Sequence, residues 1–283
     1  MAFDILLIIV TLVALLIGSV SDLKTREVPD WITYGLIIAA FGIRIIFSLQ
    51  LGLYVLLSGI LGFLVCLALA FLFYYSGQWG GGDSKLLMGM GAIVGITFPF
   101  DVSSFNLLWF FLALLFLGAI YGLLWMIVLG IVKHKIFFKN FKGYLRKKKS
   151  LHSILLIVTL IFIVLTFFKL FLWPMIFFPL GMFYVLSFVS IVEKSCFLKT
   201  IEPFHLTEGD WLAKDVIIQR KTVMEAKTLE KDDVWKLRFL EGEGKLKKVT
   251  IKEGVPFVPS FLFAYIFIIF FDSLLKVLET FLY

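Results

Sequence analysis

Two aspartates, Asp22 and Asp83, stand beside long apolar segments, 61 positions apart in the chain. An ionisable group near membrane depth is costly, so it needs a chemical or structural reason. Two carboxyl groups brought close together do not both ionise easily, and such a pair can share one proton. One carboxylate then acts as a general base on water while the other, protonated, polarises a carbonyl group. The roles exchange as the tetrahedral intermediate collapses, and the chemistry needs neither a metal nor a covalent nucleophile.

The second aspartate follows three glycines, in the sequence Gly80-Gly81-Gly82-Asp83. Because glycine has no side chain, backbones and a substrate can approach this segment closely, while the carboxyl group stays at the start of the next helix. The same tetrapeptide also fits a flexible loop followed by an N-capping aspartate, which is a common use of that residue. A partner carboxyl group such as that of Asp22 favours the chemical interpretation.

The other residues that could carry chemistry are scattered. The chain has two cysteines and three histidines, which are Cys66, Cys196, His134, His152 and His205. Two cysteines do not make a four-cysteine zinc site, and the histidines stand in no nucleophile or metal-ligand motif. The net charge of +7 comes without a nucleic-acid-binding motif, and the basic residues cluster beside apolar segments. We therefore expect no metal, no cofactor and no nucleic-acid partner.

The composition is that of a membrane protein. Of the 283 residues, 61% are hydrophobic and only 17% are charged. Apolar runs such as Leu51 to Tyr75 and Phe105 to Val132 are long enough, at about 1.5 Å per residue, to cross a hydrocarbon core of about 30 Å. The first run, Ile5 to Val20, lacks a basic start and a cleavage site, so we expect a retained helix. The expected fold is an all-α polytopic membrane protein of about eight transmembrane helices with a small cytoplasmic β-rich insert.

Lysines and arginines indicate the orientation, because they are retained on the cytoplasmic side of short connections. The segment from Lys133 to Lys149 is basic and contains no acidic residue, so it marks that side. Counting spans backwards from it, the connection from Ser21 to Asp30 and the glycine motif before Asp83 both fall on the cytoplasmic side. Asp22 and Asp83 are therefore expected at one face of the plasma membrane, where they can share a site.

Composition also divides the chain into regions. These are a catalytic transmembrane domain with both aspartates (1–132), a basic cytoplasmic loop (133–152), a transmembrane hairpin (153–192), a cytoplasmic β-rich domain (193–254) and a C-terminal transmembrane helix (255–283). The basic loop is a candidate for contact with membrane lipids, because anionic headgroups attract clustered lysines.

Turn and alternation signals predict the β-rich domain. The sequence from Trp235 to Phe239 alternates apolar and polar residues, Glu241 to Gly244 offers turn chemistry, and Val249 to Ile251 is β-prone, which together predict a hairpin. Two further strands are predicted at Asp215 to Gln219 and Val223 to Thr228.

Two sequence blocks carry a family resemblance. The first is Asp22-Leu23-Lys24 followed by Val28-Pro29-Asp30, and the second is Gly80-Gly81-Gly82-Asp83-Ser84-Lys85. The chain resembles the type IV prepilin peptidase family, in its archaeal preflagellin peptidase branch, whose members are GxGD membrane aspartyl proteases. The resemblance implies an aspartic-type endopeptidase with Asp22 and Asp83 catalytic. It also implies that Gly80, Gly82, Lys24 and Lys85 support the site, although the two lysines equally satisfy the charge pattern of the cytoplasmic side.

The resemblance further implies a substrate, namely an archaellin or type IV pilin-like precursor whose short basic leader is cut at the cytoplasmic face. Glu27 and Asp30 are candidates to attract that leader, though they also fit a solvated loop end. Pro256 and Pro259 either expose backbone for an extended substrate or mark the start of the last helix. Bacterial members commonly carry paired cysteines and a methylating activity, and this chain lacks those cysteines, which favours the archaeal branch.

Three other classes of function compete with a peptidase. An ion- or proton-coupled transporter would also use paired membrane acids, but it predicts acids near mid-span and an internal repeat. A lipid phosphotransferase would place several metal-binding acids on one helix. A non-enzymatic assembly protein would leave the glycine motif before Asp83 without a role.

Overall fold

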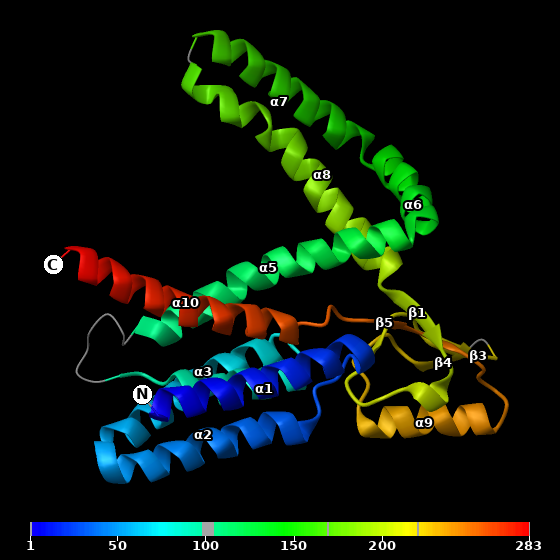
Figure 1. The fold of residues 1–283 in the computed structure, drawn as a ribbon. Coiled ribbons are helices and arrows are strands. Elements are labelled where there is room, and N and C mark those ends of the chain that lie inside the picture. The colour runs from blue at the N-terminus through cyan, green and yellow to red at the C-terminus, as the bar shows by residue number, and fades with distance from the viewer. Residues whose placement is uncertain (1, 98–104, 169, 220, 283) are drawn as a thin grey trace. The chain divides into compact units, whose positions relative to one another are not determined.

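The computed structural model describes residues 2–97, 105–168, 170–219 and 221–282. Contacts divide the chain into two compact units, one of Met1–Gly122 with Gly254–Tyr283 and one of Leu123–Glu253. Helices dominate both units (Figure 1). In chain order they are α1 (Ala2–Thr25), α2 (Asp30–Leu51), α3 (Tyr54–Tyr75), α4 (Gly81–Val94), α5 (Asn106–Val132), α6 (His134–Lys147), α7 (Lys149–Phe168), α8 (Phe178–Ile191), α9 (Lys231–Gly242) and α10 (Val258–Leu282).

Six helices among the described residues are long and apolar enough to cross a membrane. They are α1, α2, α3, α5, α7 and α8, the last extended by a π-helical turn, η3 (Val192–Cys196). The helical membrane architecture is thus confirmed, with six candidate spans where about eight were expected. The two expected spans outside this set are α4, whose 14 residues cover only about 21 Å, and α10, whose described apolar part is Val258–Phe270.

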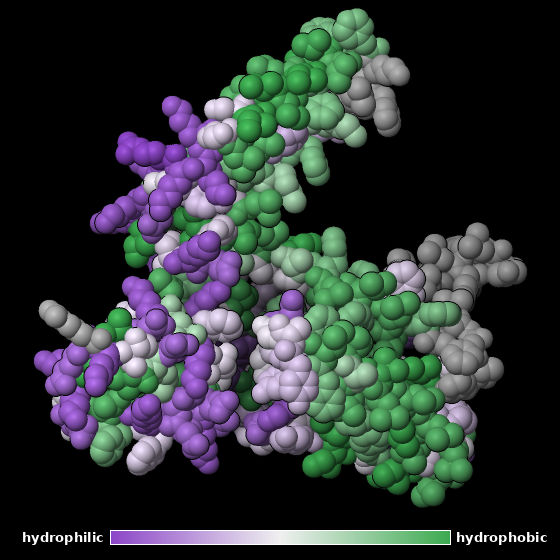
Figure 2. All heavy atoms as spheres, turned by 180° about the vertical axis from the view of Figure 1, so that it is seen from behind, coloured by the Kyte–Doolittle hydropathy of each residue, from purple (hydrophilic) through white to green (hydrophobic). Residues whose placement is uncertain are grey.

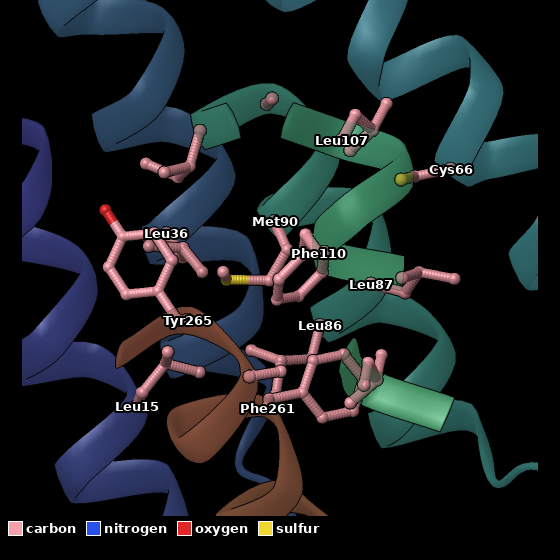
Figure 3. Close-up of a cluster of buried hydrophobic side chains, with 14 of the residues drawn as sticks. Leu15, Leu36, Cys66, Leu86, Leu87, Met90, Leu107, Phe110, Phe261 and Tyr265 are labelled. Carbon is pink, nitrogen blue, oxygen red and sulfur yellow. The ribbon is translucent and has the colours of Figure 1, made fainter. Parts of the chain in front are cut away.

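The core of the first unit is built where α4 meets its neighbours (Figure 3). Side chains from five helices converge there, and they are fully or almost fully buried. The central ones are Leu15 of α1, Leu36 of α2, Leu86 and Met90 of α4, Phe110 of α5, and Phe261 and Tyr265 of α10. The helices' outer faces carry exposed apolar side chains, as the hydrophobic surface in Figure 2 shows and as lipid contact requires.

α4 lies against α3 at backbone distance. A Cβ added to Gly91 would come within 2.6 Å of the Cβ of Cys66, and one added to Gly62 would collide with the carbonyl oxygen of Gly91. Small residues are what allow helices in lipid to approach this closely. The helix ends at Gly95, whose φ of 68° lies in the left-handed region that favours glycine.

A buried guanidinium holds the C-terminal end of α4. Arg44 of α2 is 3% exposed, and its three nitrogens donate to the carbonyl oxygens of Ala92 (2.7 Å), Ile93 (2.8 Å) and Val55 (2.7 Å). The last carbonyls of a helix have no partner within the helix, and they carry the negative end of its dipole. Arg44 therefore acts as a C-terminal cap that also ties α2 and α3 to α4.

The second unit begins with the C-terminal part of α5 and continues through α6, α7 and α8. The segment 133–152, expected as a loop, is instead helical over α6 and the start of α7, because its phenylalanines recur at helical spacing and no proline interrupts them. α7 and α8 pack as an antiparallel pair (Figure 1), joined through the 3₁₀ helix η2 (Leu170–Ile176) that contains Pro174. His152 and the Tyr184 hydroxyl lie 2.9 Å apart across this pair.

A small polar module follows η3. It contains β1 (Leu198–Ile201), β2 (Trp211–Leu212), β3 (Val216–Ile218), β4 (Lys221–Met224) and β5 (Val249–Lys252), with a short 3₁₀ turn, η4 (Pro203–His205). One antiparallel sheet has the order β1-β5-β2, and β3 and β4 form the other. The strands predicted around Ile217 and Thr250 are confirmed, and the one predicted from Val223 overlaps the end of β4.

The predicted strand from Trp235 to Phe239 is wrong, because those residues lie in α9. Two signals explain the helix. Glu230 and Asp233 form a reciprocal capping box at its start, and Val234 and Leu237, three positions apart, are buried together in the module's core.

Candidate active site

Asp22 lies near the C-terminal end of α1 and is only 5% exposed. One oxygen of its carboxylate, Oδ2, accepts a hydrogen bond of 2.9 Å from the backbone N–H of Val258. Val258 is the first residue of α10, where backbone N–H groups lack intrahelical partners and the helix dipole is positive. The first helix of the chain thus presents a carboxyl group to the start of the last one, and this bond fixes the orientation of that group.

Asp83 is the third residue of α4 and lies in its first turn. Gly80, the residue before α4, has an extended backbone and is the N-cap of the helix. The carboxyl group of Asp83 interacts with the backbone N–H of Gly80. Asp83 also lies within electrostatic range of Asp22. The two aspartates separated in sequence are thereby brought into one neighbourhood within the first unit.

Glycine makes this arrangement possible at one position in particular. A Cβ added to Gly82 would come within 3.1 Å of the Cβ of Val28, in the connection between α1 and α2. The two sequence blocks expected to form the site therefore pack directly on each other. Trp79, just before the glycines, stacks on Phe73 with ring centroids 4.6 Å apart and lies 5.4 Å from Phe257, so aromatic packing draws the start of α10 to the same place.

Lys85 does not point at the aspartate pair. Its ammonium group forms an ion pair of 2.6 Å with Asp30, the first residue of α2, and lies 5.1 Å from the ring of Tyr34. The negative charge of Asp30 is therefore matched by Lys85, although the Asp30 side chain is 64% exposed; Glu27, also exposed, is the other acid near this connection. Lys24 is exposed as well, on the last turn of α1.

The two prolines frame the start of α10. Pro256 precedes the helix and Pro259 is its second residue, and both are buried. Proline at this helical position loses no hydrogen bond, since the first N–H groups of a helix are unpaired anyway. Pro259 therefore suits a helix start. Pro256 lies two positions before Val258, whose backbone N–H donates to Asp22.

Two interactions in the first unit, the hydrogen bond to Asp22 and the bonds made by Arg44, are not evident from the sequence. The donor to Asp22 is a backbone N–H, which any residue but proline would supply at position 258. Arg44 does leave a signal, because it is a lone charge inside the apolar run from Trp31 to Phe47, but the pattern does not reveal its carbonyl partners. Within the described ranges, no group of three or more His, Cys, Asp or Glu residues could hold a metal ion.

Among known proteins, residues 9–123 match the type IV leader peptidase family. This part of the chain is therefore similar to type IV leader peptidases. Over 155 residues, 52% of this chain and 63% of the relative, the chain is 34% identical to the preflagellin peptidase of Methanococcus voltae. Over 90 residues, 30% of this chain and 37% of the relative, it is 42% identical to the preflagellin peptidase of Methanocaldococcus jannaschii. The matched part spans less than two thirds of either relative. No solved structure matches the chain significantly.

The matched residues 9–123 contain both aspartates, the glycine motif and Arg44, and the match ends within α5. The predicted family resemblance is thus confirmed. The start of α10 lies outside the matched residues, although Val258 supplies the hydrogen bond to Asp22.

Proposed function

We propose that the chain is a membrane aspartic endopeptidase that removes the short basic leader from archaellin or type IV pilin-like precursors, with Asp22 and Asp83 as its catalytic pair. The observation that supports the proposal is that the carboxyl groups of Asp22 and Asp83, each in a terminal turn of its helix, lie within electrostatic range of each other in the segment that matches the type IV leader peptidase family. A transporter fits less well, because both acids stand in terminal turns of their helices and not at mid-helix.

In the proposed reaction one carboxylate takes a proton from a water molecule, whose oxygen attacks the carbonyl carbon of the scissile peptide bond. The other carboxyl group, protonated, donates to the carbonyl oxygen as it gains negative charge. Breakdown of the tetrahedral intermediate breaks the C–N bond, and the proton held by the first aspartate passes to the leaving amine. The N–H of Val258 keeps the Asp22 carboxyl group in one orientation through these steps.

The substrate part of the proposal rests on charge and on the named relatives. Glu27 is exposed five positions after Asp22, so its charge would attract a basic leader on the side where the proposed cut is made. The proposal places this side at the cytoplasmic face of the plasma membrane, which follows from the basic segment Lys133–Lys149 by the positive-inside rule.

The test is to co-express a tagged archaellin or pilin precursor with the wild type, Asp22→Asn and Asp83→Asn. Wild-type protein should produce the mobility shift of leader removal, and each variant should lose it. Asp232→Asn, an exposed acid on α9, is the matched control and should cleave normally. Each variant is first checked for a monodisperse peak in detergent. Full cleavage by both Asp22→Asn and Asp83→Asn would overturn the proposal.

A further inference from the structure

α6 is linked at each end to a candidate membrane span. Only Lys133 separates it from α5, and only Lys148 separates it from α7, and both of these neighbours are candidate spans. A helix of 14 residues is about 21 Å long, and one-residue links leave it no freedom to move away from the bilayer. Lipid headgroups extend roughly 5–7 Å beyond each side of the hydrocarbon core. α6 therefore lies among or directly above them.

One face of α6 is a stripe of cations. Lys135, Lys139, Lys142 and Arg146 follow one another at helical spacing, which places them within a sector of about 60°. All four are exposed. The segment from Lys133 to Lys149, which contains α6, has no acidic residue, so no neighbour within it neutralises the charge of the stripe.

Another face of the helix is already occupied by protein. Phe137 lies with its ring centroid 5.5 Å from that of Phe188 in α8 and stacks on Phe141 at 5.6 Å. Lys133, just before α6, donates to the carbonyl oxygen of Cys196 at 2.5 Å. These contacts fix how α6 is rotated about its axis. The cation stripe is thereby held away from α8, with its long apolar stems free to extend along the interface.

We propose that this stripe is a binding surface for anionic phospholipids, whose phosphate groups it contacts at the bilayer surface. A row of positive charges held at headgroup height is complementary to a negatively charged leaflet, and each lysine or arginine there raises the affinity about fivefold. A basic leader peptide would be repelled by the same row. The surface is therefore distinct in chemistry from the proposed peptidase site and does not depend on it.

The test uses full-length protein in nanodiscs of equal phosphatidylglycerol and phosphatidylcholine, in phosphate-free buffer. Native mass spectrometry counts the lipids of each kind that stay bound when the disc is removed. The quadruple variant Lys135→Gln, Lys139→Gln, Lys142→Gln and Arg146→Gln should lower the phosphatidylglycerol to phosphatidylcholine ratio at least fivefold.

Two controls separate charge at this place from net charge and from folding. The variant Lys214→Gln, Lys231→Gln, Lys247→Gln and Lys248→Gln removes the same charge from exposed positions of the polar module and should keep the wild-type ratio. Replacing the three lysines of the stripe by arginine keeps the positive charge, and it should keep the wild-type ratio of bound phosphatidylglycerol to phosphatidylcholine as well. An unchanged ratio in the stripe variant, or an equal loss in the module control, would overturn the proposal.

Discussion

Removing the guanidinium of Arg44 should loosen the end of α4 that lies opposite Asp83. Arg44→Met keeps an unbranched side chain of comparable length but removes all three donors. Polar bonds between membrane helices are worth about 0.6 kcal/mol on average and about 1.7 kcal/mol at most. Three such bonds give a loss of about 2 kcal/mol, with an upper bound near 5 kcal/mol. Relief from burying the charge offsets part of that loss, so we expect a value near the lower figure.

The assay is reversible unfolding of the full-length protein in mixed micelles with increasing sodium dodecyl sulfate, followed by helical circular dichroism. The free energy of unfolding of Arg44→Lys should lie between those of the wild type and Arg44→Met, because an ammonium group cannot reach all three carbonyl oxygens in the same geometry. Ile46→Ala, at a position 62% exposed on the same helix, is the matched control and should change little. If the free energies of unfolding of Arg44→Met and the wild type differ by less than about 0.5 kcal/mol, the bonds of Arg44 do not stabilise α4 and the prediction is wrong.

Three further outcomes are expected. Gly91→Ala should lower the unfolding temperature, because its Cβ would overlap Cys66, while Gly42→Ala meets nothing within 4 Å and should be neutral or stabilising; equal shifts would contradict the packing. A hydrogen bond from Lys227 holds the pKa of the Asp233 carboxyl below its usual range. The ionised Asp233 carboxylate therefore stabilises α9 above about pH 4, and this stabilisation is lost as the pH falls further. Hydrogen exchange of α9, corrected for intrinsic rates, should show this loss in the wild type and not in Asp233→Asn; identical profiles would refute it. Glu27→Lys should raise the apparent KM for a basic leader, and an unchanged KM would exclude the proposed attraction.

Residue patterns predict some parts of this molecule well. The long helices follow from the length of the apolar runs, since lipid leaves the backbone few alternatives to a helix. Counting spans predicts only that Asp22 and Asp83 fall at one membrane face, whereas the electrostatic proximity of their carboxyl groups depends on how α1 and α4 pack.

Other parts depend on information that residue types do not carry. Alternation over the five residues from Trp235 to Phe239 fits a strand as well as one and a half helical turns, and the capping box at Glu230 decides for the helix. The segment after Lys133 is rich in charge, which suggests a loop, but its helical form emerges only from the spacing of its aromatic residues. The hydrogen bond from Val258 is a backbone interaction, so no side chain indicates it.

The bond between Asp22 and Val258 joins positions 236 residues apart, and this sets an order of events during synthesis. The ribosome makes α1 first, and its carboxyl group enters the membrane long before its donor exists. At about 5–20 residues per second, the interval is on the order of 10–50 s. A newly inserted chain therefore carries Asp22 for tens of seconds without the helix start that orients its carboxyl group, and the proposed peptidase activity has to await the synthesis of α10.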